Sequence, residues 1–207
     1  GGTASASTTV SINTPVGSLI PQQQLHVVSV DSQDTVGGNY AATNALDGNP
    51  ATFWHSEWYQ RTAPLPHTLV LDLGSQYQVD GFRYLPRQDG QSEGTIAGYE
   101  FYVSPDGSTW GSAVAAGTLA ANTSEKTVPF PAKTGRYVRL IALSEMNGYA
   151  YTSAAELNVF GTIQTLPPVT VTLSAAPATI TAGQASTVTW AATNATACSG
   201  SGGLIAP

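Results

Sequence analysis

Residues 47–58, DGNPATFWHSEW, open with the chemistry of a tight turn. Asp47 offers a side-chain acceptor, Gly48 tolerates positive φ, and Pro50 has a fixed φ. The stretch then becomes apolar at 53–54, where we expect a buried indole. Polar and aromatic side chains follow directly, namely His55, Glu57, Trp58 and Tyr59. This pattern predicts a loop that anchors itself and displays a binding surface, and it is less typical of catalysis.

The composition excludes several classes of function. Of the 207 residues 10% are charged, and 13 acidic against 7 basic residues give a formal net charge of -6. Binding to a nucleic-acid backbone requires clustered Lys and Arg, so we expect no nucleic-acid partner. No apolar run reaches about 18 residues, so we expect no membrane span. Low charge with many Thr, Ser, Ala and Gly residues favours a secreted, extracellular bacterial module over a cytosolic enzyme.

Alternating apolar and polar residues predict short strands along the middle of the chain. The pattern is clearest at 136–143 (RYVRLIAL), and the stretch 41–46 is expected to form one helical turn. No amphipathic helix of ten residues is visible, and turn signals separate the strands. Further strands are expected at 25–32, 69–73, 81–85, 96–104, 124–131 and 156–161. Repeated short strands of this kind indicate an all-β, antiparallel sandwich.

The two ends of the chain differ in character from this middle part. Residues 1–24 are small, polar and punctuated by proline, as in a linker or the tail of a preceding module. No charged segment precedes an apolar one there, so we expect a mature or excised piece. Residues 162–168 are a second predicted linker. Residues 169–207 contain two alternating strands and resemble the opening of a bacterial immunoglobulin-like repeat. Cys198 is the only cysteine, so no intrachain disulfide is possible.

Six segments distributed over residues 25–161 carry a family resemblance. They are ALDGNPATFWHSEW (45–58), LPHTLVLDLGS (65–75), FRYLPRQDG (82–90), GYEFYVSPDGSTW (98–110), GRYVRLIAL (135–143) and SAAELNVFG (153–161). In this order they resemble the discoidin, or coagulation factor V/VIII C-type, domain, and most closely carbohydrate-binding module family 32. The resemblance implies a galactose-binding-like jelly-roll β-sandwich.

The oxygen-rich residues Asp47, Asn49 and Thr52 suit a hard cation such as calcium, which takes six to eight oxygen ligands. The family resemblance implies a structural calcium at this loop and at the start of the last strand. Its implied ligands are the carboxylates of Asp47 and Glu156, the hydroxyl and carbonyl of Thr52, and the carbonyls of Asn44, Asn49 and Ala155. The alternative is that Asp47 only caps a turn and Glu156 is an exposed strand residue.

A galactose-type ring has an apolar face and a polar rim, so its binding needs an aromatic platform and fixed hydrogen-bonding groups. The resemblance implies a site in loops at one end of the sandwich. The candidate residues are His55, Glu57, Trp58, Arg87, Asp89, Glu93, Asn147, Tyr149 and Tyr151.

Simpler roles remain open for several of these candidates. His55 could be a packed loop histidine, and Arg87 could pair with Asp89 in a solvated turn. Of the two tyrosines Tyr151 is the better match, and one of the pair could pack inward. Glu93 stands where galactose-binding members often have asparagine, which leaves room for a different specificity.

The preferred function is a non-catalytic, calcium-stabilised module. It would anchor a secreted multidomain protein to glycans of the galactose, N-acetylgalactosamine or N-acetylglucosamine type. Its other partners would be domains of the same parent chain. An adhesion-type domain that binds a protein is the alternative, and the net charge disfavours an anionic membrane. No nucleophile elbow, zinc-spacing motif or phosphate-binding glycine loop is present, so no enzymatic activity is expected.

Overall fold

The computed structural model describes residues 17–165, 167–195 and 197. The chain divides into two compact units, Gly1–Gln164 and Thr165–Pro207. None of the helices in the described ranges has the length and hydrophobicity needed to span a bilayer. In the described residues both units are built from strands, and the helical content there is limited to two short 3-10 turns, η1 (Gln22–Gln24) and η2 (Ala42–Leu46).

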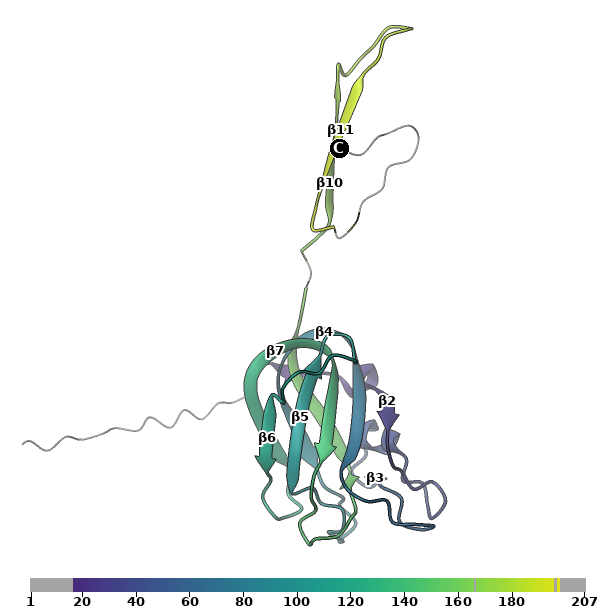
Figure 1. The fold of residues 1–207 in the computed structure, drawn as a ribbon, viewed down its shortest axis with the longest axis vertical. Coiled ribbons are helices and arrows are strands. Elements are labelled where there is room, and N and C mark those ends of the chain that lie inside the picture. The colour runs from purple at the N-terminus through teal and green to yellow at the C-terminus, as the bar shows by residue number, and fades with distance from the viewer. Residues whose placement is uncertain (1–16, 166, 196, 198–207) are drawn as a thin grey trace, which may run out of the picture. The chain divides into compact units, whose positions relative to one another are not determined.

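The first unit is a curled antiparallel sandwich, which confirms the predicted all-β jelly roll (Figure 1). Its seven-stranded sheet has the order β1-β9-β4-β7-β5-β6, and β2 pairs with β4. A separate two-stranded ladder joins β3 to β8. The strands are β1 (Ser18–Leu19), β2 (His26–Val30), β3 (Trp54–His55), β4 (His67–Leu85), β5 (Gly98–Ser104), β6 (Ala115–Thr118), β7 (Lys126–Ala142), β8 (Ser153–Ala154) and β9 (Glu156–Ile163).

Two long strands, β4 and β7, connect the two layers of the sandwich. They pair from His67 with Ala142 to Tyr84 with Lys126, and the register shifts between Asp72 and Tyr77. Before this shift β4 also pairs with β2, and after it β4 pairs with β9. Each long strand therefore contributes one half to each layer. The stretches 69–73 and 81–85, predicted as separate strands, are both parts of β4.

The core lies between these layers and follows the alternation of the strands. In the first half of β4 the fully buried hydrophobic residues are Leu69, Leu71 and Leu73. A second register shift between Val79 and Gly81 resets the alternation, as an extra residue in one strand does. As a result Phe82 still points inward, and its ring stacks on that of Phe101 with centroids 4.4 Å apart. Each such ring contributes about 1.5–3 kcal/mol through its burial.

The first unit begins earlier than the predicted boundary at residue 25. Ser18 and Leu19 pair with β9, and Ile20 is only 2% exposed. Residues 17–24 therefore belong to the sandwich and not to a linker, whereas residues 1–16 lie outside the described parts. A two-residue strand is too short to show an alternating pattern, so the sequence contained no signal for it.

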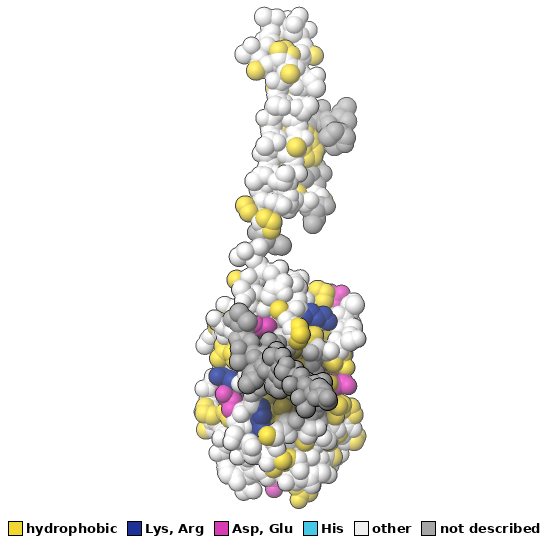
Figure 2. Space-filling view, turned by 90° about the vertical axis from the view of Figure 1, so that its left-hand side faces the viewer, with side chains coloured by type: hydrophobic (Ala, Val, Ile, Leu, Met, Phe, Trp, Pro, Cys, Tyr) yellow, Lys and Arg dark blue, Asp and Glu magenta, His cyan; other side chains and the backbone are white. Residues whose placement is uncertain are grey.

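The second unit contains an antiparallel hairpin of β10 (Thr170–Ala176) and β11 (Thr187–Thr193), as the alternation predicted. Leu173 lies opposite Trp190, and Leu173 is 67% exposed. Residues 165–207 contain no Asp, Glu, Lys or Arg. Figure 2 accordingly shows charged side chains only on the first unit, where both signs are interspersed. Cys198 lies outside the described residues.

Candidate functional site

The short ladder between β3 and β8 brings together two loops that are about one hundred residues apart in the chain. His55 is opposite Ser153 in this ladder. Beyond it, the Ser56 N–H donates to the Thr152 carbonyl at 2.8 Å, and the Thr152 N–H donates to Ser56 Oγ at 3.0 Å. Successive strand side chains point to opposite faces, so Trp54 enters the core and His55 faces the loops. The segments around 55 and 151 are thereby held side by side.

A third loop, residues 86–97, is fastened to the same ladder at Gly94. The Ser153 N–H donates to the Gly94 carbonyl at 2.7 Å, and Ser153 Oγ donates to the carbonyl of Glu93 at 3.2 Å. Gly94 has φ +87°, and a Cβ there would lie 2.8 Å from the Ser153 nitrogen. Only glycine fits this close approach without strain. The contact fixes the backbone of Glu93 beside the β3 loop.

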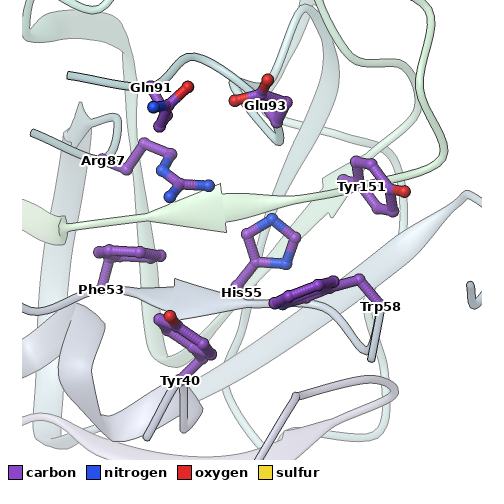
Figure 3. A pocket seen from close by; sticks show the side chains of 8 residues that line it. All are labelled: Tyr40, Phe53, His55, Trp58, Arg87, Gln91, Glu93 and Tyr151. Atoms are coloured by element: carbon purple, nitrogen blue, oxygen red, sulfur yellow. The ribbon is translucent and has the colours of Figure 1, made fainter. Parts of the chain in front are cut away.

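These loops enclose a pocket with a cavity volume of about 280 Å³. This volume lies just below the usual range for drug-sized ligands, about 300–1,000 Å³, and suits one small ring. Five of the predicted binding residues line the pocket, namely His55, Trp58, Arg87, Glu93 and Tyr151. Three further lining residues, Tyr40, Phe53 and Gln91, were not predicted. Figure 3 shows His55 in the middle of the group, with the Arg87 guanidinium directed toward it above the Phe53 ring.

Arg87 is held in place from two sides. Its Nε and Nη2 donate to the two carboxylate oxygens of Asp89 at 2.8 and 2.5 Å. Its guanidinium carbon lies 4.5 Å from the centroid of the Phe53 ring. The hydrogen bonds from Arg87 hold the pKa of the Asp89 carboxyl below its usual value. Asp89 does not line the pocket itself and instead orients Arg87, whose remaining N–H groups are available to a ligand.

His55 is 3% exposed and has one nitrogen committed to the protein. Its Nδ1 lies 2.7 Å from the Ser56 carbonyl oxygen. A carbonyl only accepts, so Nδ1 carries a proton and Nε2 of the neutral ring is a lone-pair acceptor. Burial, together with the charge of Arg87, lowers the pKa of His55 from its ordinary value. The neutral form, with an acceptor beside the donor Arg87, is therefore favoured.

Aromatic rings form the walls of the pocket. The Tyr151 ring centroid lies 5.5 Å from that of His55, and Trp58 contacts His55 edge-on at 6.4 Å. On the other side Tyr40 stacks on Phe53 at 5.0 Å. Trp58 is 42% exposed, so part of its ring faces solvent. Such rings offer an apolar surface of defined orientation.

Asp34, which sequence reasoning also missed, holds the Trp58 loop. One carboxylate oxygen accepts from the N–H groups of Trp58 and Tyr59 at 3.3 and 2.9 Å. The other accepts from Val36 and Gly37 at 3.0 and 2.7 Å. Burial works to raise the pKa of Asp34, and these hydrogen bonds outweigh it, so the pKa lies below its ordinary value. Nothing in the sequence connects Asp34, which precedes a glycine turn, with Trp58, because the two residues come together only in the folded chain.

The remaining predicted sugar-binding residues lie around the pocket without lining it. Glu57 accepts from Arg61 Nε at 2.8 Å. Asn147 Nδ2 donates to Ser92 Oγ at 3.2 Å. Tyr149 is 51% exposed and lies beside Tyr151. None of these three side chains lines the pocket.

The predicted calcium ligands lie at the turn after η2 and at the start of β9. Asp47 Oδ1 accepts from the Asn49 N–H at 2.8 Å, and Oδ2 accepts from Thr52 Oγ1 at 2.6 Å. Thr52 Oγ1 also lies 2.9 Å from the Asn49 carbonyl oxygen. Within the described ranges no group of three or more His, Cys, Asp or Glu residues could hold a metal ion. A cation here would therefore depend on two carboxylates supplemented by hydroxyl and carbonyl oxygens.

The environment of Glu156 tests whether this region can hold a cation. It is 6% exposed, and its Oε1 is buried without a hydrogen-bond partner in the described structure. Gln22 Nε2 donates to its other oxygen. Burial, with the nearby charge of Asp47, raises the pKa of the Glu156 carboxyl. A buried, incompletely paired carboxylate beside a second acid is suited to a cation. The alternative that Glu156 is an exposed strand residue is wrong, because the side chain is buried.

The two other predicted ligand residues also lie near this region. Asn44, in η2, donates its side-chain amide to the carbonyls of Asn39 and Phe53 at 2.7 and 3.2 Å. Ala155 is fully buried, and its N–H donates to the Leu85 carbonyl at 2.8 Å. Both residues would contribute backbone carbonyls only.

The comparisons agree on one family. The F5/8 type C domain model matches residues 28–157. A sialidase from Micromonospora viridifaciens is 40% identical over 161 residues, which cover 77% of this chain and 24% of the sialidase. A family 32 carbohydrate-binding module from Clostridium perfringens, in complex with GalNAc-β-1,3-galactose, has a TM-score of 0.63 at 35% identity. That alignment covers 69% of this chain and 99% of the module.

A second solved relative is the family 32 module of Clostridium perfringens NanJ in complex with galactose. It has a TM-score of 0.61 at 32% identity, over 70% of this chain and 99% of the module. The chain spans about a quarter of the length of the sialidase that it matches. The family model covers most of the first unit and more than half of the chain. The chain therefore belongs to the F5/8 type C domain family.

Proposed function

We propose that this chain is a non-catalytic carbohydrate-binding module for galactose-type or amino sugars. The observation that carries the proposal is the pairing of the His55 Nε2 acceptor with the oriented donors of Arg87 in an aromatic pocket. A sugar hydroxyl both donates and accepts, so one hydroxyl can satisfy both side chains at once. Two solved relatives, the modules in complex with GalNAc-β-1,3-galactose and with galactose, support this ligand class.

The rest of the pocket suits the remaining faces of such a ring. Trp58 and Tyr151 offer apolar surface for its C–H groups. The carboxylate of Glu93 and the amide of Gln91 can hydrogen-bond hydroxyls farther along the rim. These groups bind and orient a neutral ring, and none of these roles requires a chemical step.

Calcium is the second part of the proposal. Asp47 and Glu156 would supply carboxylates, Thr52 its hydroxyl and carbonyl, and Asn44, Asn49 and Ala155 their carbonyls. The incompletely paired oxygen of Glu156 supports this assignment. The bound ion would neutralise the two acids and fix the loop that leads into Phe53 and His55. Its role is structural, since these ligands do not line the sugar pocket.

In the parent protein this module would anchor neighbouring domains to a glycan surface. Tethering raises the local concentration of a linked domain near its target. The matched sialidase is about four times the length of the aligned region, which supports a multidomain parent. We place this parent outside the cell, where such glycans occur. The β10–β11 hairpin would begin an immunoglobulin-like repeat in it.

Isothermal titration calorimetry against galactose and N-acetylgalactosamine, preceded by a glycan-array screen, tests the sugar-binding proposal. Arg87→Ala should abolish binding and leave the melting temperature nearly unchanged, because a partly exposed ion pair contributes at most about 1 kcal/mol. Arg61→Ala is the matched control, since Arg61 pairs with Glu57 outside the pocket. Absence of binding to every glycan would refute the proposal and favour a protein partner. A large loss of stability in Arg87→Ala would show that Arg87 is structural.

A further inference from the structure

The aromatic wall of the pocket continues beyond the pocket itself. Tyr151 lines the cavity, and the ring of Tyr149 lies next to it, with centroids 5.6 Å apart and planes inclined by 30°. Tyr149 is 51% exposed and does not line the cavity. One tyrosine of the pair thus faces the pocket, and its neighbour presents an accessible ring just outside it.

Tyr149 lies on a loop that is held firmly before any ligand binds. Glu145 is 5% exposed, and its Oε2 accepts from the N–H groups of Asn147 and Tyr149 at 2.7 and 3.0 Å. Gly148 has φ +83°, which permits the tight turn between these two residues. The buried carboxylate therefore fixes the backbone directly beneath the exposed ring.

The other end of the loop is fastened by His67, which is fully buried. Its Nε2 lies 3.2 Å from the carbonyl oxygen of Ala150, and its Nδ1 lies 2.8 Å from Asp31 Oδ2. Tyr149 is thus bracketed by two anchored positions, 145 and 150. A side chain on an ordered loop loses little conformational entropy when it stacks on a ligand, so such a ring is well suited to binding.

A second exposed aromatic, Tyr59 beside Trp58, provides a contrast. Tyr59 is 61% exposed and meets Trp58 edge-on, with planes at 87°. Gly37 packs on the base of Tyr59, because a Cβ at Gly37 would lie 2.7 Å from Tyr59 Cβ. The Tyr59 ring is thus nearly perpendicular to the Trp58 ring, whereas the Tyr149 ring is inclined by only 30° to the Tyr151 ring.

We propose that Tyr149 forms a second sugar subsite, so that the preferred ligand is a neutral oligosaccharide of at least two residues. Its terminal residue would occupy the pocket, and the adjoining residue would stack on Tyr149. This inference rests on the proposed function and adds the direction in which the glycan leaves the pocket. The continuity of Tyr149 with a lining residue, its exposure and its anchored backbone carry the inference.

Calorimetry with galactose and with galactose-terminated disaccharides of several linkages, lactose included, tests this subsite. We expect at least one disaccharide to bind about 2- to 10-fold more tightly than galactose, the gain of one aromatic contact. Tyr149→Ala should bring the ratio of disaccharide affinity to galactose affinity down to about one, and Tyr149→Trp should preserve the ratio of the wild type. Tyr59→Ala is the matched control and should keep the gain.

The possible failures are distinguishable. Galactose binding with no gain for any disaccharide would overturn the subsite and leave the proposed function intact. A gain that survives in Tyr149→Ala and disappears in Tyr59→Ala would overturn the Tyr149 subsite and place the second sugar residue beside Tyr59. No binding of galactose or of any disaccharide would overturn the proposed function itself.

Discussion

Glu156→Gln should change the stability of this module in opposite directions with and without calcium. The substitution keeps the size of the side chain and an oxygen that can accept from Gln22. It removes a negative charge from a position that is 6% exposed, where the charge of Asp47 repels it. Without a cation the buried charge of Glu156 destabilises the fold. With a bound cation the same carboxylate acts as a ligand.

The sizes of the two effects follow from this environment. Without calcium the wild type leaves one buried oxygen unpaired, which costs about 1–3 kcal/mol, and the neutral amide should recover about 1 kcal/mol of it. With free calcium at about 100 times its Kd, binding stabilises the wild type by about 2.7 kcal/mol. In calcium the variant forgoes this stabilisation but keeps its gain of about 1 kcal/mol, so its net loss is about 1.7 kcal/mol. At about 2–4 °C per kcal/mol, the variant should melt about 2–4 °C above the wild type in chelator and about 3–7 °C below it in calcium.

Differential scanning calorimetry of both proteins in chelator and in calcium measures these shifts. The pH dependence adds a check, because the folded-state pKa of Glu156 is raised. The calcium-free wild type should therefore gain stability relative to Glu156→Gln as pH falls through this pKa. The calcium-induced shift should fade over the same interval, since a protonated carboxyl is a poor ligand. Equal destabilisation of Glu156→Gln in chelator and in calcium would refute the reasoning.

Three further predictions concern the pocket. Asp89→Asn should weaken galactose binding about fivefold in calorimetry, because about 1 kcal/mol of Arg87 positioning is lost, and unchanged affinity would show that stacking on Phe53 suffices. Galactose affinity should stay constant as pH falls to about 6.5, the ordinary pKa of histidine, and drop only below it, when protonation removes the acceptor of His55. A midpoint above this value in a pH titration would contradict the lowered pKa of His55. Galacturonate should bind about tenfold more weakly than galactose, because Asp89 neutralises Arg87 and leaves the Glu93 carboxylate to repel an anion. Glu93→Gln should narrow that gap in a competition assay, and equal affinities of the wild type for both sugars would exclude this charge selection.

Much of the fold was predictable because its signals are local. The alternation at 136–143 reappears as the second half of β7, and the alanine-rich stretch 41–46 contains the single turn η2. Side-chain alternation depends only on the backbone of one strand, so it is visible without knowledge of the partner strand. The two-residue strands β1, β3 and β8 were missed, since a pair of residues has no period. They exist because distant segments complete their hydrogen bonds.

The pocket shows the same division among its residues. The family resemblance predicted His55, Arg87 and Tyr151 as binding residues, and all three line the cavity. Tyr40 follows a glycine turn with no sign of a binding role, and Phe53 had the pattern of a core residue. Tyr40 is brought to the pocket by the His55 N–H, which donates to its carbonyl at 3.2 Å, and Phe53 directly precedes the paired strand β3. Their contribution depends on tertiary contacts and not on the residues beside them.

Local sequence patterns were enough to predict most of the longer strands, the turns and the family motif around residues 47–58, because periodicity and turn chemistry act over a few residues. Tertiary structure decided which side chains share the pocket. The loops at 55–58, 87–93 and 151 meet only when the long strands β4 and β7 close the sandwich. That closure also buries Glu156 beside the 47–52 turn and leaves Tyr149 outside the cavity. Contacts between residues so far apart depend on the packing of the whole core, which no short stretch of sequence specifies.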